Sequence, residues 1–111
     1  MLFDKTSLSA KAGKNIKLTL NHTGKIGKEF MGHNFVLLKK GVDIDDFAML
    51  ALDFKENEYI PKNNDFIVHT GMLGGGESET INFIIEEAGI YKYVCTFPGH
   101  YQIMQGELTI E

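Results

Sequence analysis

The chain carries a thiol, an imidazole and a thioether close together near its end, in the segment Cys95-Thr96-Phe97-Pro98-Gly99-His100-Tyr101-Gln102-Ile103-Met104. Soft thiolate and thioether donors favour Cu(I), whereas imidazole binds either oxidation state, so this mixture suits copper that cycles between Cu(I) and Cu(II). One Cys and two His in a plane, with a long and weak axial Met, form the blue-copper arrangement. Pro98 and Gly99 favour a tight loop. The spacing therefore predicts that Cys95 and His100 fold onto one copper ion, which needs a second imidazole from elsewhere.

The second imidazole must come from one of the three remaining histidines, which are His22, His33 and His69. His33 directly precedes the most apolar run of the chain, where it would be held rigidly at one end of a sheet. His22 lies in a turn-like stretch and His69 in an alternating strand, so both are interpreted as surface or hydrogen-bonded histidines. Cys95 alone would be interpreted as an inert buried thiol. Together with His100 and Met104, it is a metal ligand candidate.

The elements that must position these side chains are mostly strands. Short segments with alternating apolar residues, or rich in β-branched and aromatic residues, are bounded by Gly, Asn and Lys turns. Strands are predicted at residues 15–20, 33–38, 66–70, 79–85, 89–95 and 106–110. Such spacing is typical of a β-sandwich or barrel. Gly74-Gly75-Gly76 is interpreted as a mobile hairpin turn.

One segment, from Asp43 to Lys55, shows helical periodicity instead. Its apolar residues recur at i, i+3, i+4, i+7 and i+8, namely Ile44, Phe47, Ala48, Ala51 and Leu52. Its acidic residues fall in the first turn, where the helix dipole favours negative charge: Asp43, Asp45 and Asp46. They lack the ligand spacing and the turn glycine of a calcium loop. We expect one short helix over residues 43–55, inserted in an otherwise all-β chain.

Composition limits the class of protein. The 111 residues predict one domain, 1–111. Eleven Lys+Arg against fifteen Asp+Glu give a net charge of −4, which disfavours nucleic-acid binding. No apolar run approaches the ~18 residues of a membrane span, so a soluble protein is expected. A single cysteine excludes an internal disulfide and any multi-cysteine zinc or iron–sulfur site.

The chain resembles the azurins, within the cupredoxins. The resemblance rests on Gly32-His33-Asn34, followed far downstream by Cys95-Thr96-Phe97-Pro98-Gly99-His100-x-x-x-Met104, and it covers nearly the whole chain. It implies a Greek-key β-sandwich or barrel with one copper per chain. It further implies that His33, Cys95 and His100 form the trigonal plane, with Met104 and the Gly32 carbonyl as axial neighbours. Azurins carry a disulfide near the N-terminus, which this chain cannot form.

The resemblance also implies contacts around the ligands. The backbone N–H groups of Asn34 and Phe97 would donate to the Cys95 sulfur, and the Asn34 side chain would tie the ligand loop to Thr96. Such contacts tune redox potential and rigidity.

The expected function is a diffusible, monomeric one-electron carrier and not an enzyme. Its partners would be c-type cytochromes or a copper- or haem-containing reductase. They would dock near His100 on an apolar surface formed by Met31, Phe97, Pro98, Gly99 and Ile103, because exposed apolar patches mark docking sites. The family implies a periplasmic location. The alternative is a copper-binding or copper-delivery protein without electron transfer. An enzyme reading is disfavoured because protein ligands fill every metal position.

Overall fold

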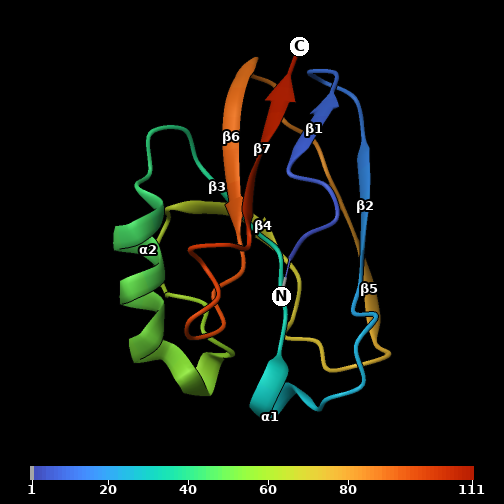
Figure 1. Cartoon of the computed structure of the whole chain (residues 1–111). Coiled ribbons are helices and arrows are strands. Elements are labelled where there is room, and N and C mark those ends of the chain that lie inside the picture. Colours follow the sequence, from blue (N-terminus) through green and yellow to red (C-terminus); the bar gives the residue numbers. More distant parts are fainter. Residues whose placement is uncertain (1) are drawn as a thin grey trace.

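The protein folds as a sandwich of two β-sheets with one helix packed on the outside (Figure 1). The computed structural model describes residues 2–111. Within this range a five-stranded sheet has the order β1-β7-β6-β3-β4, and a two-stranded sheet pairs β2 with β5. The strands are β1 (Ser7–Ala10), β2 (Ile16–Asn21), β3 (Val36–Leu38), β4 (Phe66–His69), β5 (Ser78–Phe83), β6 (Gly89–Val94) and β7 (Gln105–Ile110). The expected all-β sandwich is confirmed.

Pairing within the sheets is antiparallel except at one edge. β1 runs parallel to β7, with Leu8 opposite Leu108. β6 lies between β7 and β3, and β2 pairs with β5 along its whole length, with Leu18 opposite Ile81. The central position of β6 matters for the site, because Cys95 follows its last residue directly.

The core has two parts, one on each face of the five-stranded sheet. Between the sheets, Leu37 packs in a cluster with large side chains that include Phe35 and Tyr93. On the outer face, Val36 and Leu38 pack against the helix and its flanking loops. All three residues of β3 are fully buried. Because successive side chains of a strand point to opposite faces, an unbroken apolar run indicates a strand covered on both sides.

The predicted helix is present and is shorter than expected. α2 spans Ile44–Ala51 and continues into a 3₁₀-helix, η1, over Leu52–Asn57. Its buried residues are Ile44, Phe47, Ala48 and Ala51, on the face expected from the periodicity. Asp43 is the N-cap residue, and its carboxylate accepts a 2.9 Å hydrogen bond from the Asp46 backbone N–H. The acidic cluster therefore begins a helix, as the sequence indicated.

Three features differ from the sequence predictions. β1 was not predicted, because four residues with a single large apolar side chain, Leu8, carry little pattern, and the partner strand β7 is distant in sequence. α1, a single turn over Lys28–Met31, is too short to show periodicity. The glycine run forms the expected turn, in which the Glu77 N–H donates to the Gly74 carbonyl at 3.1 Å, but this turn is packed tightly against another segment. A Cβ on Gly75 would lie 2.6 Å from Lys25, and the Gly75 N–H donates to the Ile26 carbonyl at 2.9 Å.

None of the helices within residues 2–111 is long and apolar enough to cross a membrane.

The Asp43 cap gives a test of the helix start. Replacing Asp43 by Ala should lower the free energy of unfolding by about 1 kcal/mol, because the Asp46 N–H loses its acceptor. Asp45→Ala, at an exposed first-turn position without this bond, should change it by less than about 0.5 kcal/mol. Urea unfolding of the metal-free proteins measures both. Equal losses in the two variants would show that charge, and not capping, sets the stability of the helix start.

Candidate metal centre

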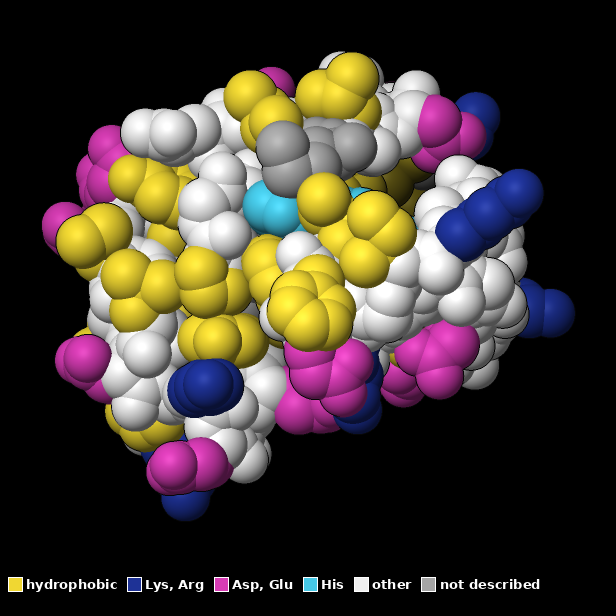
Figure 2. Space-filling model, turned by 60° about the horizontal axis from the view of Figure 1, so that its bottom comes forward, with side chains coloured by type: hydrophobic (Ala, Val, Ile, Leu, Met, Phe, Trp, Pro, Cys, Tyr) yellow, Lys and Arg dark blue, Asp and Glu magenta, His cyan; other side chains and the backbone are white. Residues whose placement is uncertain are grey.

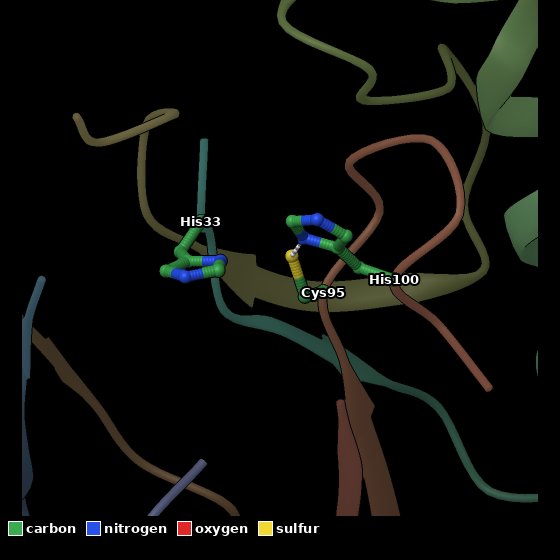
Figure 3. Close-up of side chains that lie close together, drawn as sticks. All are labelled: His33, Cys95 and His100. Carbon is green, nitrogen blue, oxygen red and sulfur yellow. Dashed lines mark hydrogen bonds between the residues drawn. The ribbon is translucent and has the colours of Figure 1, made fainter. Parts of the chain in front are cut away.

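Three donor side chains meet at one end of the sandwich. One nitrogen of His33, the sulfur of Cys95 and one nitrogen of His100 all lie within 4.8 Å of one another (Figure 3). The Cys95 Sγ is 3.8 Å from the His100 Nδ1. Within the part of the chain that the structure describes, this is the one group of His, Cys, Asp or Glu side chains arranged to hold a metal ion. Met104, the fourth residue singled out from the sequence, is buried beside them at 1% exposure.

His33 is held by backbone pairing just before β3. It forms an isolated antiparallel bridge with Leu73, in which the His33 N–H donates to the Leu73 carbonyl at 3.0 Å and the Leu73 N–H returns a bond of 2.8 Å. Gly32 precedes it in a crowded place, because a Cβ there would lie 2.8 Å from Met72 and 2.9 Å from the Lys28 carbonyl. Only glycine fits this approach without displacing its neighbours.

The loop after β6 folds Cys95, His100 and Met104 together through its own backbone. The Cys95 N–H donates to the Met104 carbonyl at 3.0 Å, and the Met104 N–H donates to the His100 carbonyl at 2.8 Å. Gly99 turns the chain with φ +84°, a left-handed conformation that favours glycine. His100 and Met104, five and nine positions after Cys95, thus return to the end of β6. This is the tight loop that Pro98 and Gly99 predicted.

The two ligand-bearing segments are joined by the Asn34 side chain. Its Nδ2 donates to the Thr96 Oγ1 at 2.8 Å, and its Oδ1 accepts from the Thr96 N–H at 2.8 Å. The Thr96 hydroxyl in turn donates to the Tyr59 carbonyl at 2.8 Å. Asn34 is fully buried and Thr96 is nearly so. Since Asn34 follows His33 and Thr96 follows Cys95, these two bonds set the separation of the imidazole and the thiol.

Burial keeps both imidazoles neutral. The pKa of His33 is lowered to about 4, first because burial penalises the charged ring and then because His22 and His100 would add like charge. Burial likewise lowers the pKa of His100. A neutral imidazole has a lone pair to offer a metal, so both rings are in the ligand form at neutral pH.

The Cys95 sulfur is buried and receives backbone hydrogen bonds. Burial raises the pKa of the thiol to about 11, while the N–H groups of Asn34 and Phe97 act in the opposite direction by donating to the sulfur. These are the two donors that the resemblance implied. Without a metal the thiol stays protonated at neutral pH, and a bound cation would displace the proton to reach the thiolate.

The side chains of His22 and His69 hydrogen-bond backbone groups and are not part of the three-donor group. The His22 Nδ1 accepts from the Gly24 N–H at 3.1 Å, so its Nε2 carries the hydrogen that bonds the Met31 carbonyl at 2.7 Å. Sequence reasoning left open whether His22 was exposed. It is buried and stacks on the His33 ring, with centroids 4.3 Å apart. The turn-like sequence around His22 gave no indication that its ring would stack on His33. His69 bonds the Thr70 carbonyl through Nδ1 at 2.7 Å.

The chemistry of the donor atoms suits a metal ion. The Nδ1 of His33 is buried, and among residues 2–111 no group hydrogen-bonds it. A buried nitrogen without a partner is costly, and a metal would remove that cost. One sulfur and two neutral imidazoles, with a thioether nearby, suit copper better than the harder cations, which prefer oxygen.

Comparisons with known proteins decide the family. The sequence profile of copper binding proteins of the plastocyanin/azurin family matches residues 1–111. The chain belongs to this family. It is 35% identical to Azurin-1 of Alcaligenes xylosoxydans xylosoxydans, covering 99% of this chain and 89% of that protein. It is 36% identical to the azurin of Bordetella pertussis, covering 99% of this chain and 77% of the relative.

Solved cupredoxin structures have the same fold. Auracyanin A, a blue copper protein from Chloroflexus aurantiacus, superposes with a TM-score of 0.89 at 30% identity, covering 99% of this chain and 89% of that one. The azurin Az-iso2 of Methylomonas sp. strain J gives a TM-score of 0.86 at 30% identity, with the same coverage. Family and donor chemistry together make the chain an azurin-like blue copper protein with one copper per chain.

The Asn34 link gives a stability prediction for this cupredoxin. Asn34→Ala should lower the free energy of unfolding by about 2–4 kcal/mol, because it breaks two buried bonds and leaves the Thr96 N–H without an acceptor. Asn82 makes one exposed side-chain bond of 3.3 Å, so Asn82→Ala should cost less than about 0.5 kcal/mol. Denaturant unfolding of the metal-free proteins compares the two. Similar small losses would remove Asn34 as the link between the ligand segments.

Proposed function

We propose that this cupredoxin carries single electrons between redox partners, using a mononuclear copper held by His33, Cys95 and His100. Met104 would add a weakly binding thioether, and the Gly32 carbonyl would offer an oxygen to the same ion. The observation that carries the proposal is that one buried thiol, one buried imidazole and one half-buried imidazole lie within 4.8 Å of one another. Copper bound there supplies a one-electron change between Cu(I) and Cu(II), which these mixed soft and borderline donors serve in both states.

The protein's own contribution is a rigid site shielded from water. Cys95 is fully buried, and His100 and Met104 are 4% and 1% exposed. The Asn34–Thr96 bonds and the backbone of the ligand loop keep the donors in one arrangement, so little has to move when the charge changes. The N–H groups of Asn34 and Phe97 stabilise negative charge on the sulfur. Hydrogen bonds to the sulfur and burial of the site both tune the reduction potential.

An apolar surface beside the site is proposed as the docking surface for the partner. Figure 2 shows a histidine side chain at the surface of this face with several hydrophobic side chains beside it. Of the predicted residues, Gly99 and Ile103 are exposed, and Met31, Phe97 and Pro98 are half-buried. Phe30, which the sequence analysis missed, is 80% exposed. Small apolar interfaces suit brief redox encounters.

We propose c-type cytochromes, or a copper- or haem-containing reductase, as the partners, with electrons passing near His100. The kinship with azurins supports a periplasmic monomer and a role as a carrier without catalytic turnover.

Copper delivery without electron transfer is the alternative. It requires ligands that a recipient can reach and exchange, such as exposed Met or His in a flexible tract. Here Cys95, His100 and Met104 are at most 4% exposed, and His33 is half-buried. This burial favours retention of the metal, and therefore a carrier of electrons over a carrier of copper.

Rapid mixing separates the two functions. The Cu(I) protein is mixed with an oxidised c-type cytochrome, and the blue absorption of the Cu(II) protein and the haem spectrum are followed together. A carrier turns blue as the haem is reduced and keeps its copper in the presence of a Cu(I) chelator. Loss of copper to the chelator on the same timescale, without haem reduction, would favour delivery.

Cys95 should be indispensable for the colour, because only a thiolate gives the strong charge-transfer band of such a site. Cys95→Ser should fold and lose the intense blue band and the haem reduction, as followed by absorption and circular dichroism. His69→Gly, which removes a histidine bonded to the backbone, should keep both. An intensely blue Cys95→Ser protein would contradict the ligand assignment.

Met104 should affect the reduction potential of the copper more than the affinity for copper, because a long thioether bond is weak and favours Cu(I). Met104→Gln, with a harder oxygen donor, should stay coloured and have a lower reduction potential. Met104→Leu removes the donor, keeps the site dry and should raise the potential. Cyclic voltammetry of the three proteins in one buffer measures the order Gln, Met, Leu. Identical potentials would mean that Met104 is not an axial ligand.

A further inference from the structure

Acidic side chains border one part of the docking surface. Figure 2 shows a group of them directly beside the hydrophobic side chains of this face. Four glutamates and two lysines belong to this region: Glu29, Glu58, Glu77, Glu79, Lys25 and Lys28. Together they leave two net negative charges, which is half of the net charge of −4 of the whole chain. The four glutamates are called the acidic flank below.

Three carboxylates of the acidic flank are held by backbone N–H groups of the loop 71–74. The Gly71 N–H donates to the Glu79 carboxylate at 2.7 Å, and the Met72 N–H donates to the Glu58 carboxylate at 3.5 Å. The Glu77 carboxylate accepts in the same way from the last residue of this loop. A hydrogen bond to a backbone N–H fixes the position of a carboxylate and does not cancel its charge. The negative charges are therefore held in place around one loop.

The loop 71–74 packs against α1, which carries part of the docking surface. A Cβ on Gly74 would lie 2.9 Å from the backbone nitrogen of Lys28, the first residue of α1. The Lys28 Nζ lies 3.4 Å from the Glu58 Oε2, and the two side chains stay 50% and 47% exposed. Phe30 and Met31 complete this helix. The acidic flank therefore lies beside the α1 part of the docking surface.

Glu58 and Tyr59 have strained backbone conformations that place them between α1 and the ligand loop. Their φ angles are +53° and +62°, and within residues 2–111 they are the two residues other than glycine with positive φ. The Tyr59 carbonyl accepts from the Thr96 hydroxyl at 2.8 Å, and the Tyr59 ring lies edge-on to Phe97 with centroids 6.1 Å apart. Such conformations cost free energy that glycine would avoid, and they gather at functional sites. The strain indicates that the placement of the Glu58 carboxylate has a function.

The part of the docking surface on the ligand loop is uncharged. The sequence from Cys95 to Gly106 contains no Asp, Glu, Lys or Arg. In this segment Gly99 and Ile103 are exposed, and the neighbouring exposed side chain of Gln102 is neutral. The docking surface is thus acidic beside the loop 71–74 and neutral along the ligand loop. Such an uneven distribution of charge favours a single orientation of a charged partner.

We propose that the redox partner has an apolar contact area bordered on one side by basic side chains, which meet Glu58, Glu77 and Glu79. This inference rests on the proposed electron transfer and adds the chemistry of the partner to it. Opposite charges speed the encounter and align the two proteins, and the apolar contact then brings the partner close to His100. Because the carboxylates of the acidic flank are largely exposed, salt should screen this attraction.

The test removes the charge and keeps the acceptor oxygens. The test variant combines three substitutions: Glu58→Gln, Glu77→Gln and Glu79→Gln. A glutamine oxygen still accepts from the backbone of the loop 71–74, so a purely structural role is preserved. The control variant has the same net charge and combines Glu86→Gln, Glu87→Gln and Glu111→Gln. These positions lie between β5 and β6 and at the C-terminus, at the end of the sandwich away from α1 (Figure 1).

Rapid mixing of the Cu(I) proteins with an oxidised basic c-type cytochrome measures the second-order rate constant of haem reduction. At low ionic strength the test variant should react about tenfold more slowly than the unaltered protein, and its rate should depend less on salt. The control variant should stay within about twofold of the unaltered protein. An acidic c-type cytochrome should react faster with the test variant than with the unaltered protein. An unchanged blue band and reduction potential show that the metal site is intact in both variants.

Docking is measured apart from electron transfer when both proteins are reduced, because no electron can then pass. Nuclear magnetic resonance of the Cu(I) protein should show amide shifts in the loop 71–74 and at Gly99 and Ile103, and the test variant should lose them. Such shifts without haem reduction in the mixing experiment would contradict electron transfer and support the basic partner. Equal rates for the test and control variants, or shifts confined to another face, would overturn the inference and leave electron transfer standing. Broadening of the same amides as the protein alone is concentrated would also overturn it, because a second copy would then occupy the surface.

Discussion

The metal centre depends on one constraint, which is that two segments distant in sequence must bring neutral donors together in a buried place. The Asn34 side chain meets this constraint with two 2.8 Å bonds to Thr96. Each bond pairs buried polar groups that would cost free energy if they were left without a partner. The link is therefore strongly favoured once the core has formed. Since each partner is the chain neighbour of a donor residue, the bonds that stabilise the fold also set the spacing of the donors.

The donors are positioned at one end of the sandwich by strand β6 and the loop that follows it. Strand β6, covered by the second sheet on one face and by α2 and its loops on the other, gives Cys95 a fixed starting point. The ligand loop then closes on itself through its own backbone, so Met104 and His100 need few outside contacts.

Local patterns predicted a large part of this arrangement. Alternation located most strands, and helical spacing located the helix, because burial on one face repeats every second or every 3.6 residues. The donor types and their spacing indicated copper before any contact was known, since metal preference follows from the ligand atoms. β1 and the packing of Gly75 were missed. Both depend on contacts with distant segments, which leave no periodic signal in a few residues.

The sequence by itself determined the chemistry: one thiol, a loop that returns imidazole and thioether to it, and an apolar strand preceded by His33. Only the tertiary structure decided which nitrogen is left without a partner, because His22 and His69 also had to be placed. The His22 nitrogens bond Gly24 and Met31, whereas no group within residues 2–111 hydrogen-bonds the Nδ1 of His33. A side chain's availability as a ligand depends on what its neighbours in space already satisfy, and those neighbours are assembled only when the sheets pack.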